Sequence, residues 1–266
     1  MIELQSLHLQ VDGRVARLRF EHGKANEMGT PQLDELEQLA EWLEGGPVAA
    51  MVTWSERVSG RGTPIFVSGA NVTERHGWSD ERVKAHVRRQ RAILARLRAV
   101  PVFHACVVHG IAFGWGTEFL LACDYRIATP GARLALPETG LGILPGAGGS
   151  SELPRLVGVH HALRLGMTGE VIGAEEAARI GLVDEIQADL PTALARVQAL
   201  VALVSRRSPT AVAAYKAAVR AGSPDDEAAA YEHCVDSGEA AIGRAGFAAI
   251  NAGEPVAWGP FRPWRR

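Results

Sequence analysis

The stretch CVVHGIAFGWGTEFLLACDYRIA, residues 106–128, decides the fold of this chain, and LALPETGLGILPGAGGSSE, residues 134–152, follows shortly after it. Gly110, Gly114 and Gly116 lie between two apolar runs, residues 101–108 and 119–123. A short apolar run, a cluster of glycines and a second apolar run predict a buried strand, a turn and the start of a helix.

The turn at residues 114–116 also predicts a place for a negatively charged oxygen. The first N–H groups of a helix have no partner within that helix, and the positive end of the helix dipole lies there. Backbone N–H groups at such a turn can therefore bind an oxyanion.

Two acids, Glu118 and Glu138, require a chemical explanation. We expect each of them in the first turn of a helix, with Glu138 directly behind Pro137, a residue favoured at the first helical position. A glutamate at such a position is often only a partner of the helix dipole. Taken singly, neither acid distinguishes that role from a catalytic one.

The whole string resembles a known family. The pattern H-G-x-A-x-G-x-G-x-E-x-x-L-x-C-D, followed by P-E-x-x-L-G-x-x-P-G-A-G-G, is similar to that of the enoyl-CoA hydratase/isomerase (crotonase) family, and the likeness extends over nearly all 266 residues. The resemblance implies an α/β fold, a crotonase-like spiral of strand-strand-helix repeats with a C-terminal helical oligomerisation region. It further implies a core at residues 1–200, a helical region at 201–266, and a homotrimer or dimer of trimers.

Patterns along the rest of the chain predict mixed α/β structure. Alternating residues across Asp12-Gly13 predict an antiparallel strand pair. Amphipathic periodicity predicts a helix from Thr30, as N-cap, to Glu44. Further strands are expected at 48–54, 64–67, 101–108, 123–129, 133–136 and 182–186, and further helices at 79–98, 153–167, 174–181, 190–205, 209–221 and 224–251.

Composition predicts an ordinary soluble globular protein. Hydrophobic residues make up 47% of the chain, charged residues 22%, and the net charge is −2. This balance does not favour nucleic acid as a partner. An odd count of three cysteines implies neither a disulfide framework nor a metal cluster, and no apolar run is long enough to span a membrane. We therefore expect a cytoplasmic protein without metal, cofactor or membrane anchor.

By the resemblance, Ala70 and Trp115 supply two backbone N–H groups of an oxyanion hole, Glu118 acts as the base on water, and Glu138 donates a proton to the α-carbon. The resemblance implies one further set of substrate-binding residues: Lys24, Ala25, Ser68, Gly69, Val72, Gly114, Pro137, Leu141 and Gly146. Three positions depart from the family pattern, where Trp115 replaces a glycine, Asn71 an aspartate and Thr73 a lysine. The indole of Trp115 would either form a wall of the acyl pocket or pack against a neighbouring helix.

The expected reaction is hydration of an α,β-unsaturated acyl thioester, or the reverse dehydration, through an enolate stabilised in the oxyanion hole, as in fatty acid metabolism. Of two carboxyl groups that share a pocket, one can accept a proton from the reactants while the other donates one. The alternatives are another crotonase reaction (double-bond isomerase, thioester hydrolase or decarboxylase) or a non-catalytic scaffold. Members of the family that catalyse those other reactions commonly lack one of the two acids.

The thioester carrier is the second open question. Acyl-CoA is the expected substrate, and Lys24 matches a family position near the adenosine of coenzyme A. An acyl-carrier-protein thioester is the alternative, since an acidic carrier would meet the basic helix that carries Lys84, Arg88, Arg89 and Arg91.

Overall fold

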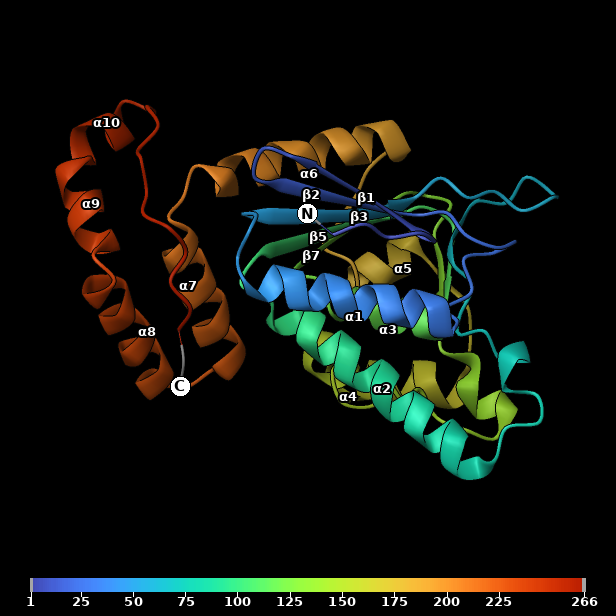
Figure 1. Ribbon diagram of the computed structural model, residues 1–266. Coiled ribbons are helices and arrows are strands. Elements are labelled where there is room, and N and C mark those ends of the chain that lie inside the picture. The colour runs from blue at the N-terminus through green and yellow to red at the C-terminus, as the bar shows by residue number, and fades with distance from the viewer. Residues whose placement is uncertain (1, 265–266) are drawn as a thin grey trace.

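The computed structural model describes residues 2–264 and places two sheets among the helices (Figure 1). The larger sheet has the order β1-β2-β3-β5-β7-β10, and the smaller one has the order β4-β6-β8-β9. The larger sheet contains β1 (Leu7–Asp12), β2 (Val15–Phe20), β3 (Ala50–Ser55), β5 (Phe103–Val108), β7 (Tyr125–Ala128) and β10 (Glu185–Ile186). The smaller sheet contains β4 (Ile65–Val67), β6 (Ile111–Phe113), β8 (Arg133–Ala135) and β9 (Ile172–Gly173).

A strand-strand-helix unit repeats along the chain, as predicted. The helices are α1 (Thr30–Glu44), α2 (Asp80–Ala99), α3 (Trp115–Leu120), α4 (Leu153–Thr168), α5 (Ala174–Arg179), α6 (Leu190–Ser205), α7 (Pro209–Ala221), α8 (Pro224–Asp236), α9 (Glu239–Ala245) and α10 (Phe247–Asn251). In the units β3-β4-α2, β5-β6-α3 and β7-β8-α4, the first strand joins the larger sheet and the second joins the smaller one. Each unit therefore adds one strand to each sheet, and each added strand runs parallel to the strand of the preceding unit.

The larger sheet separates two layers of apolar side chains. Alternate residues of β5 point to opposite faces. Ala105 and Val107 pack with Val197 and Val201 of α6, whereas Cys106 and Val108 belong to the main core on the other side. Helices α1, α2 and α4 cover that second side, while α6 lies alone over the first (Figure 1). Since both faces of the parallel strands are buried, the strands read as continuous apolar runs in the sequence.

The C-terminal helices α7–α10 stand beside this layered body rather than over the sheets (Figure 1). Several of their large apolar side chains are exposed, among them Tyr215, Tyr231 and Phe247. An oligomerisation role for this region stays a prediction. So does the division into domains at residue 200, a position that lies inside α6.

Three predicted element boundaries were wrong. The predicted helix 224–251 is three helices, because Gly238 adopts a left-handed conformation with φ 85° and the chain turns again at Gly246. Only residues 185–186 of the predicted strand 182–186 are extended, since Leu182 and Val183 donate backbone hydrogen bonds to Ala177 at the end of α5. Gly29, rather than Thr30, caps α1. Glu138 lies, as predicted, in the first turn of a helix behind Pro137, which is the short 3₁₀ helix η2 (Pro137–Leu141).

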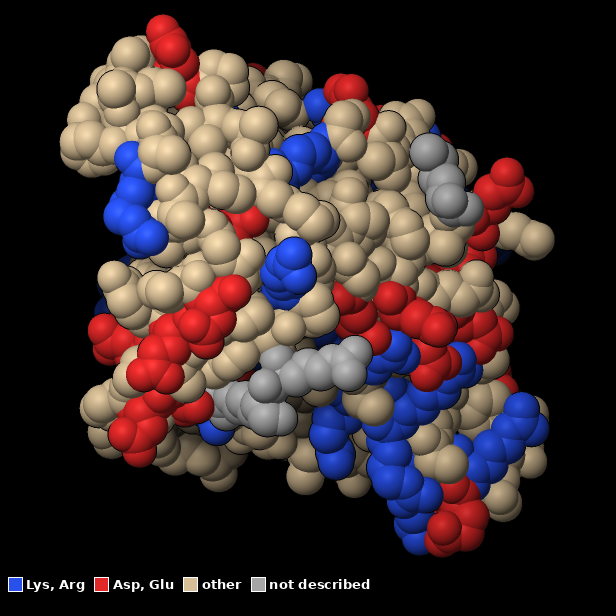
Figure 2. Space-filling view, turned by 60° about the vertical axis from the view of Figure 1, so that its left-hand side comes forward, with Lys and Arg blue, Asp and Glu red and all other residues tan. Residues whose placement is uncertain are grey.

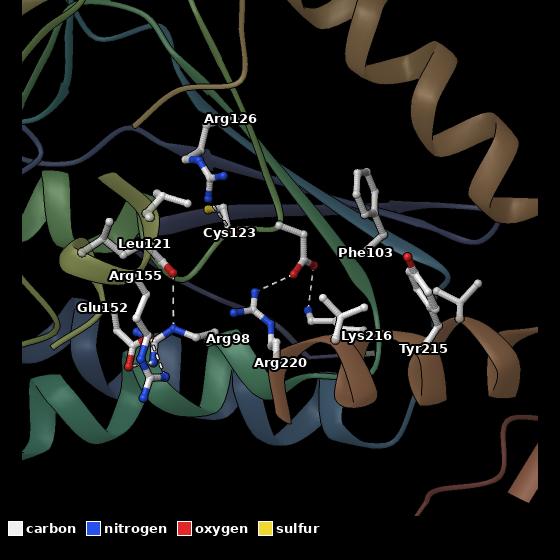
Figure 3. Close-up of a pocket in the computed structure, with 14 residues that line it drawn as sticks. Arg98, Phe103, Leu121, Cys123, Arg126, Glu152, Arg155, Tyr215, Lys216 and Arg220 are labelled. Atoms are coloured by element: carbon white, nitrogen blue, oxygen red, sulfur yellow. Dashed lines mark hydrogen bonds and ion pairs between the residues drawn. The ribbon is translucent and has the colours of Figure 1, made fainter. Parts of the chain in front are cut away.

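A partly buried ion-pair cluster joins α7 to the core. The Asp124 carboxylate accepts hydrogen bonds from Lys216 Nζ at 2.7 Å, Arg220 Nη2 at 2.6 Å and the His104 backbone N–H at 2.9 Å (Figure 3). Burial alone would raise the pKa of Asp124, but these neighbours hold it below its ordinary value. The cavity beside the cluster, about 550 Å³, includes neither Glu118 nor Glu138.

Ion pairs outside this cluster join neighbouring helices. Lys and Arg side chains gather low on the face seen in Figure 2, with a band of Asp and Glu next to them. Between α2 and α1, Arg89 pairs with Asp34 and Glu37, and Arg96 pairs with Glu44. No helix in residues 2–264 combines the length and the apolar character needed to cross a bilayer.

Asp124→Asn should lower the free energy of unfolding by about 3–5 kcal/mol, because it leaves the buried Lys216 ammonium without its counter-charge. Urea denaturation measures the change. The matched control is Glu81→Gln, which removes the exposed partner of Lys84 and should cost less than about 1 kcal/mol. Equal losses in the two variants would show that the cluster does not anchor α7.

Candidate active site

Glu118 is a buried carboxylic acid with a fixed position. Its side chain is 3% exposed. The Oε1 atom accepts hydrogen bonds from the backbone N–H groups of Ala147 at 2.7 Å and Gly149 at 2.9 Å. The loop that follows η2 therefore wraps around this carboxyl group and holds it on α3.

Glu138 approaches the same turn from the other side. A Cβ atom built on Gly114 would lie 2.7 Å from Glu138 Oε1, and Gly114 has φ 50°. Only glycine allows both this backbone conformation and this close approach. The second oxygen, Oε2, is buried and has no hydrogen-bond partner among the described residues.

The environment raises the pKa of both acids. Burial raises the pKa of Glu138 to about 7; its own backbone N–H opposes the shift and the charge of Glu118 adds to it. Burial also raises the pKa of Glu118, against the hydrogen bonds from Gly149 and Ala147 and the charge of Arg91. One carboxyl group of the pair can therefore hold a proton near neutral pH while the other stays ionised.

The loop at Ser68–Ala70 runs beside this turn. Gly69 O accepts from the Met28 N–H at 2.9 Å, and the Asn71 N–H donates to Met28 O at 2.8 Å. Because successive peptide groups alternate in an extended segment, the N–H of Ala70 points to the opposite side, away from Met28. A Cβ on Gly116 would lie 2.4 Å from Val67 O, so α3 begins in direct contact with this loop.

Trp115 is the first residue of α3, and its backbone N–H has no partner within the helix. Of the two expectations formed for it, lining the pocket agrees with the structure, whereas the ring contact lies within its own helix rather than with a neighbouring one. The indole is 2% exposed and packs on Phe119 of the same helix, with ring centroids 5.6 Å apart, and it also lines the pocket that contains the two acids. Its Nε1 donor has no partner in the described part of the chain.

Asn71 and Thr73, two departures from the expected pattern, have a local structural explanation. The Asn71 Oδ1 atom accepts from the Thr73 N–H at 3.2 Å, the Thr73 hydroxyl at 2.6 Å and the Glu74 N–H at 3.3 Å. These bonds begin the 3₁₀ helix η1 (Thr73–Arg75) directly after the Ala70 loop. An amide oxygen serves this purpose as well as a carboxylate does.

A pocket of about 240 Å³ brings most of the predicted site residues together. It is lined by predicted residues Ser68, Gly69, Ala70, Val72, Gly114, Trp115, Glu118, Pro137, Glu138, Leu141 and Gly146. Lys24 and Ala25 are not among its lining residues, and the Lys24 side chain is exposed. Their predicted contact with substrate thus receives no support from this pocket.

Sequence reasoning missed further lining residues, namely Glu27, Arg75, Val87, Gln90, Ile143, Leu144 and Ala147. Val87 and Gln90 lie three positions apart on α2, and that spacing places them on one helical face. Only the packing of α2 against the 145–149 loop shows that this face meets the acids: a Cβ on Gly146 would lie 2.8 Å from Val87 Cγ1. Within residues 2–264, no group of three or more His, Cys, Asp or Glu side chains forms a candidate metal centre.

Comparison with known proteins places this fold and site in one class. The family model described as enoyl-CoA hydratase/isomerase matches residues 13–238. Over 202 residues, 76% of each chain, the sequence is 36% identical to YngF of Bacillus subtilis (strain 168), whose name places it among the enoyl-CoA hydratase/isomerases.

Solved structures agree with that match. An enoyl-CoA hydratase from Bacillus anthracis is 28% identical, with a TM-score of 0.85 over 96% of this chain and 99% of that one. DspI of Pseudomonas aeruginosa is 30% identical, with a TM-score of 0.85 over 97% and 98%. The protein thus has the crotonase fold. It belongs to the enoyl-CoA hydratase/isomerase family.

Glu118→Gln should lower the pKa of Glu138 below about 7, because the charge of Glu118 is one cause of its elevation. Carbon-detected NMR of ¹³C-labelled glutamate across a pH titration measures this value. Glu152→Gln is a matched control outside the pocket and should leave the Glu138 titration unchanged. An unshifted pKa in Glu118→Gln would show that the two carboxyls do not interact.

Proposed function

We propose that the protein hydrates an α,β-unsaturated acyl thioester, or catalyses the reverse dehydration. The observation that carries this proposal is the placement of two carboxyl groups with raised pKa in one pocket, beside the turn where Trp115 begins α3. Hydration adds a hydroxyl at the β-carbon and a proton at the α-carbon, so it requires one group that accepts a proton and one that donates.

In the proposed reaction, the backbone N–H groups of Ala70 and Trp115 bind the thioester oxygen. Negative charge grows on that oxygen as the enolate forms, and fixed donors in a water-poor pocket stabilise it; one such donor is typically worth about 10²–10³ in rate. The replacement of glycine by tryptophan at position 115 keeps the N–H, since every residue except proline has one.

The two acids then divide the proton transfers. Glu118, whose Oε1 already accepts two N–H hydrogen bonds, is the better stabilised anion and takes a proton from the attacking water. Glu138 has a pKa of about 7, so it can hold a proton near neutral pH and give it to the α-carbon. The hydroxyl joins the β-carbon, and transfer of the proton from Glu118 back to Glu138 restores the starting state.

The alternative functions need fewer of these parts. A double-bond isomerase, thioester hydrolase or decarboxylase of this family commonly uses one acid. Such a reaction would not explain why a second carboxyl group lies in the same pocket. A non-catalytic scaffold has no need of either, and two buried carboxyls cost folding free energy. The pair therefore favours hydration.

We propose coenzyme A, rather than a carrier protein, as the thioester carrier. Docking of an acidic protein on α2 requires free positive charge, but Lys84 pairs with Glu81, Arg89 with Asp34 and Glu37, and Arg91 Nε donates to Gly146 O at 2.7 Å. Arg88 and Arg91 form no ion pair among the described residues, so two of the four predicted cations are compensated by a carboxylate. Compensated charges of this kind attract a partner weakly.

Glu118→Gln and Glu138→Gln should each lower the hydration rate of crotonyl-CoA by orders of magnitude, and the double variant should be little worse than the poorer single one. Loss of the conjugated enoyl-thioester absorbance, with a mass gain of about 18 daltons from one added water, reports the reaction. Near-wild-type turnover in either single variant would contradict the proposed roles of the acids. Circular dichroism controls for folding.

Trp115→Gly should shift the preference of the enzyme toward bulkier acyl groups, because it removes a ring that lines the pocket. The ratio of kcat/KM for a branched and a linear enoyl-CoA measures this shift. Loss of a buried aromatic side chain also destabilises by about 3–5 kcal/mol, so the assay is run well below the melting temperature. An unchanged ratio together with a lower melting temperature would limit the role of the indole to packing.

A further inference from the structure

Arg75 is a cation that lines the active-site pocket without an ionic partner. It ends η1, is half-buried, and forms no salt bridge in the described part of the protein; its Nε is buried and unpartnered. The neighbouring Glu74 uses Oε2 to accept from the Thr30 N–H and hydroxyl, and its Oε1 faces His86 Nε2 at 3.4 Å. The nearest carboxylate in sequence is thus committed elsewhere.

Two further donors line the same pocket without partners. The Gln90 side chain is 3% exposed and its Nε2 is unpartnered, as is Nε1 of Trp115. The contact of Glu74 with His86 packs η1 against α2, and Gln90 follows His86 by one helical turn on the same face. Arg75, Gln90 and Trp115 thus line one pocket, and each has a buried N–H group without a partner among the described residues.

No acid of the pocket satisfies these donors. Glu118 Oε1 is held by Ala147 and Gly149, Glu138 lies against Gly114, and the exposed Glu27 forms no ion pair. A buried donor without a partner costs about 1–3 kcal/mol each. A hydrocarbon acyl chain would leave all three unsatisfied, whereas a planar carboxylate accepts two or more N–H groups and prefers a guanidinium.

We propose that Arg75, with Gln90 and Trp115, binds a carboxylate carried on the acyl chain, so that the preferred substrate is the mono-thioester of an unsaturated dicarboxylic acid. This proposal adds a substrate class to the proposed hydration. It rests on the proposed function only in assigning the substrate a conjugated carbon–carbon double bond. Arg75 determines specificity here and takes no part in proton transfer.

Binding tests the carboxylate site without any turnover. Glutaryl-CoA is saturated and cannot be hydrated, and in 5-methylhexanoyl-CoA an isopropyl group replaces the carboxylate at the same position. By isothermal titration calorimetry, the wild type should bind glutaryl-CoA at least about tenfold more tightly than 5-methylhexanoyl-CoA. This ratio of dissociation constants corresponds to about 1.4 kcal/mol. Arg75→Met should abolish this preference, Arg75→Lys should keep part of it, and Trp115→Phe should reduce it while retaining an aromatic ring.

Arg88→Met is the matched control, since Arg88 is an exposed arginine of α2 outside the pocket and should leave the preference intact. If Arg75 instead contacts a phosphate of coenzyme A, Arg75→Met will weaken both ligands equally. That result, or equal binding of the two ligands by the wild type, would overturn the proposal.

Turnover then separates this inference from the proposed function. Glutaconyl-CoA and 5-methylhex-2-enoyl-CoA are the unsaturated counterparts of the two ligands. A higher kcat/KM for glutaconyl-CoA that Arg75→Met removes would support both proposals. Tight glutaryl-CoA binding without hydration of either compound would refute the hydratase alone, and hydration of both at equal kcat/KM would refute the carboxylate site alone.

Discussion

The hydrogen bonds from the Ala147 and Gly149 N–H groups to Glu118 are the interaction on which the site depends. They join α3, which the β5-β6 unit places, to the loop after η2, which the β7-β8 unit places. They also stabilise an ionised carboxylate at a position where burial alone disfavours one. Without them, neither the position of this carboxyl group nor its charge would be fixed.

Close backbone contacts impose the second constraint. The start of α3 touches β4 at Gly116 and Val67, and Glu138 touches the turn at Gly114, in each case at a distance that a Cβ atom would prevent. Adjacent units of the winding chain thus meet at their loops, and the pocket lies between those loops. The architecture matters for function because it brings residues 68–70, 114–118 and 138–149 together although they are far apart in sequence.

Much of this arrangement could be predicted from the sequence. The burial of residues 105–108 and the turn before Glu118 follow from apolar runs and glycine spacing, because those patterns reflect local geometry and burial. The repeating strand-strand-helix units came from the family resemblance, since the local patterns predict only mixed α/β structure. The boundaries in the C-terminal region could not be predicted as well: Gly238 and Gly246 break a pattern that is otherwise favourable to one long helix. The place of Glu138 behind Pro137 drew attention to it, but the resemblance, rather than any local pattern, assigned catalytic roles to Glu138 and Ala70.

The polar part of the pocket could not be found in this way. No sequence pattern singled out Arg75 or Gln90, and only the folded structure shows that they line the same pocket as Trp115. Lys24 shows the opposite error, since a motif position suggested a substrate contact and the side chain lies outside this pocket. A residue's place on an element is predictable from periodicity, but the element it faces is set by tertiary packing.

The central claim is that the two acids add water across a conjugated double bond. It is tested most directly by one turnover experiment in doubly labelled water, D₂O enriched in ¹⁸O, with the products analysed by mass spectrometry and NMR. The account predicts an intact thioester that carries one ¹⁸O at the β-carbon and one deuterium at the α-carbon. Free coenzyme A with ¹⁸O in the released acid, or a shifted double bond without ¹⁸O, would contradict it.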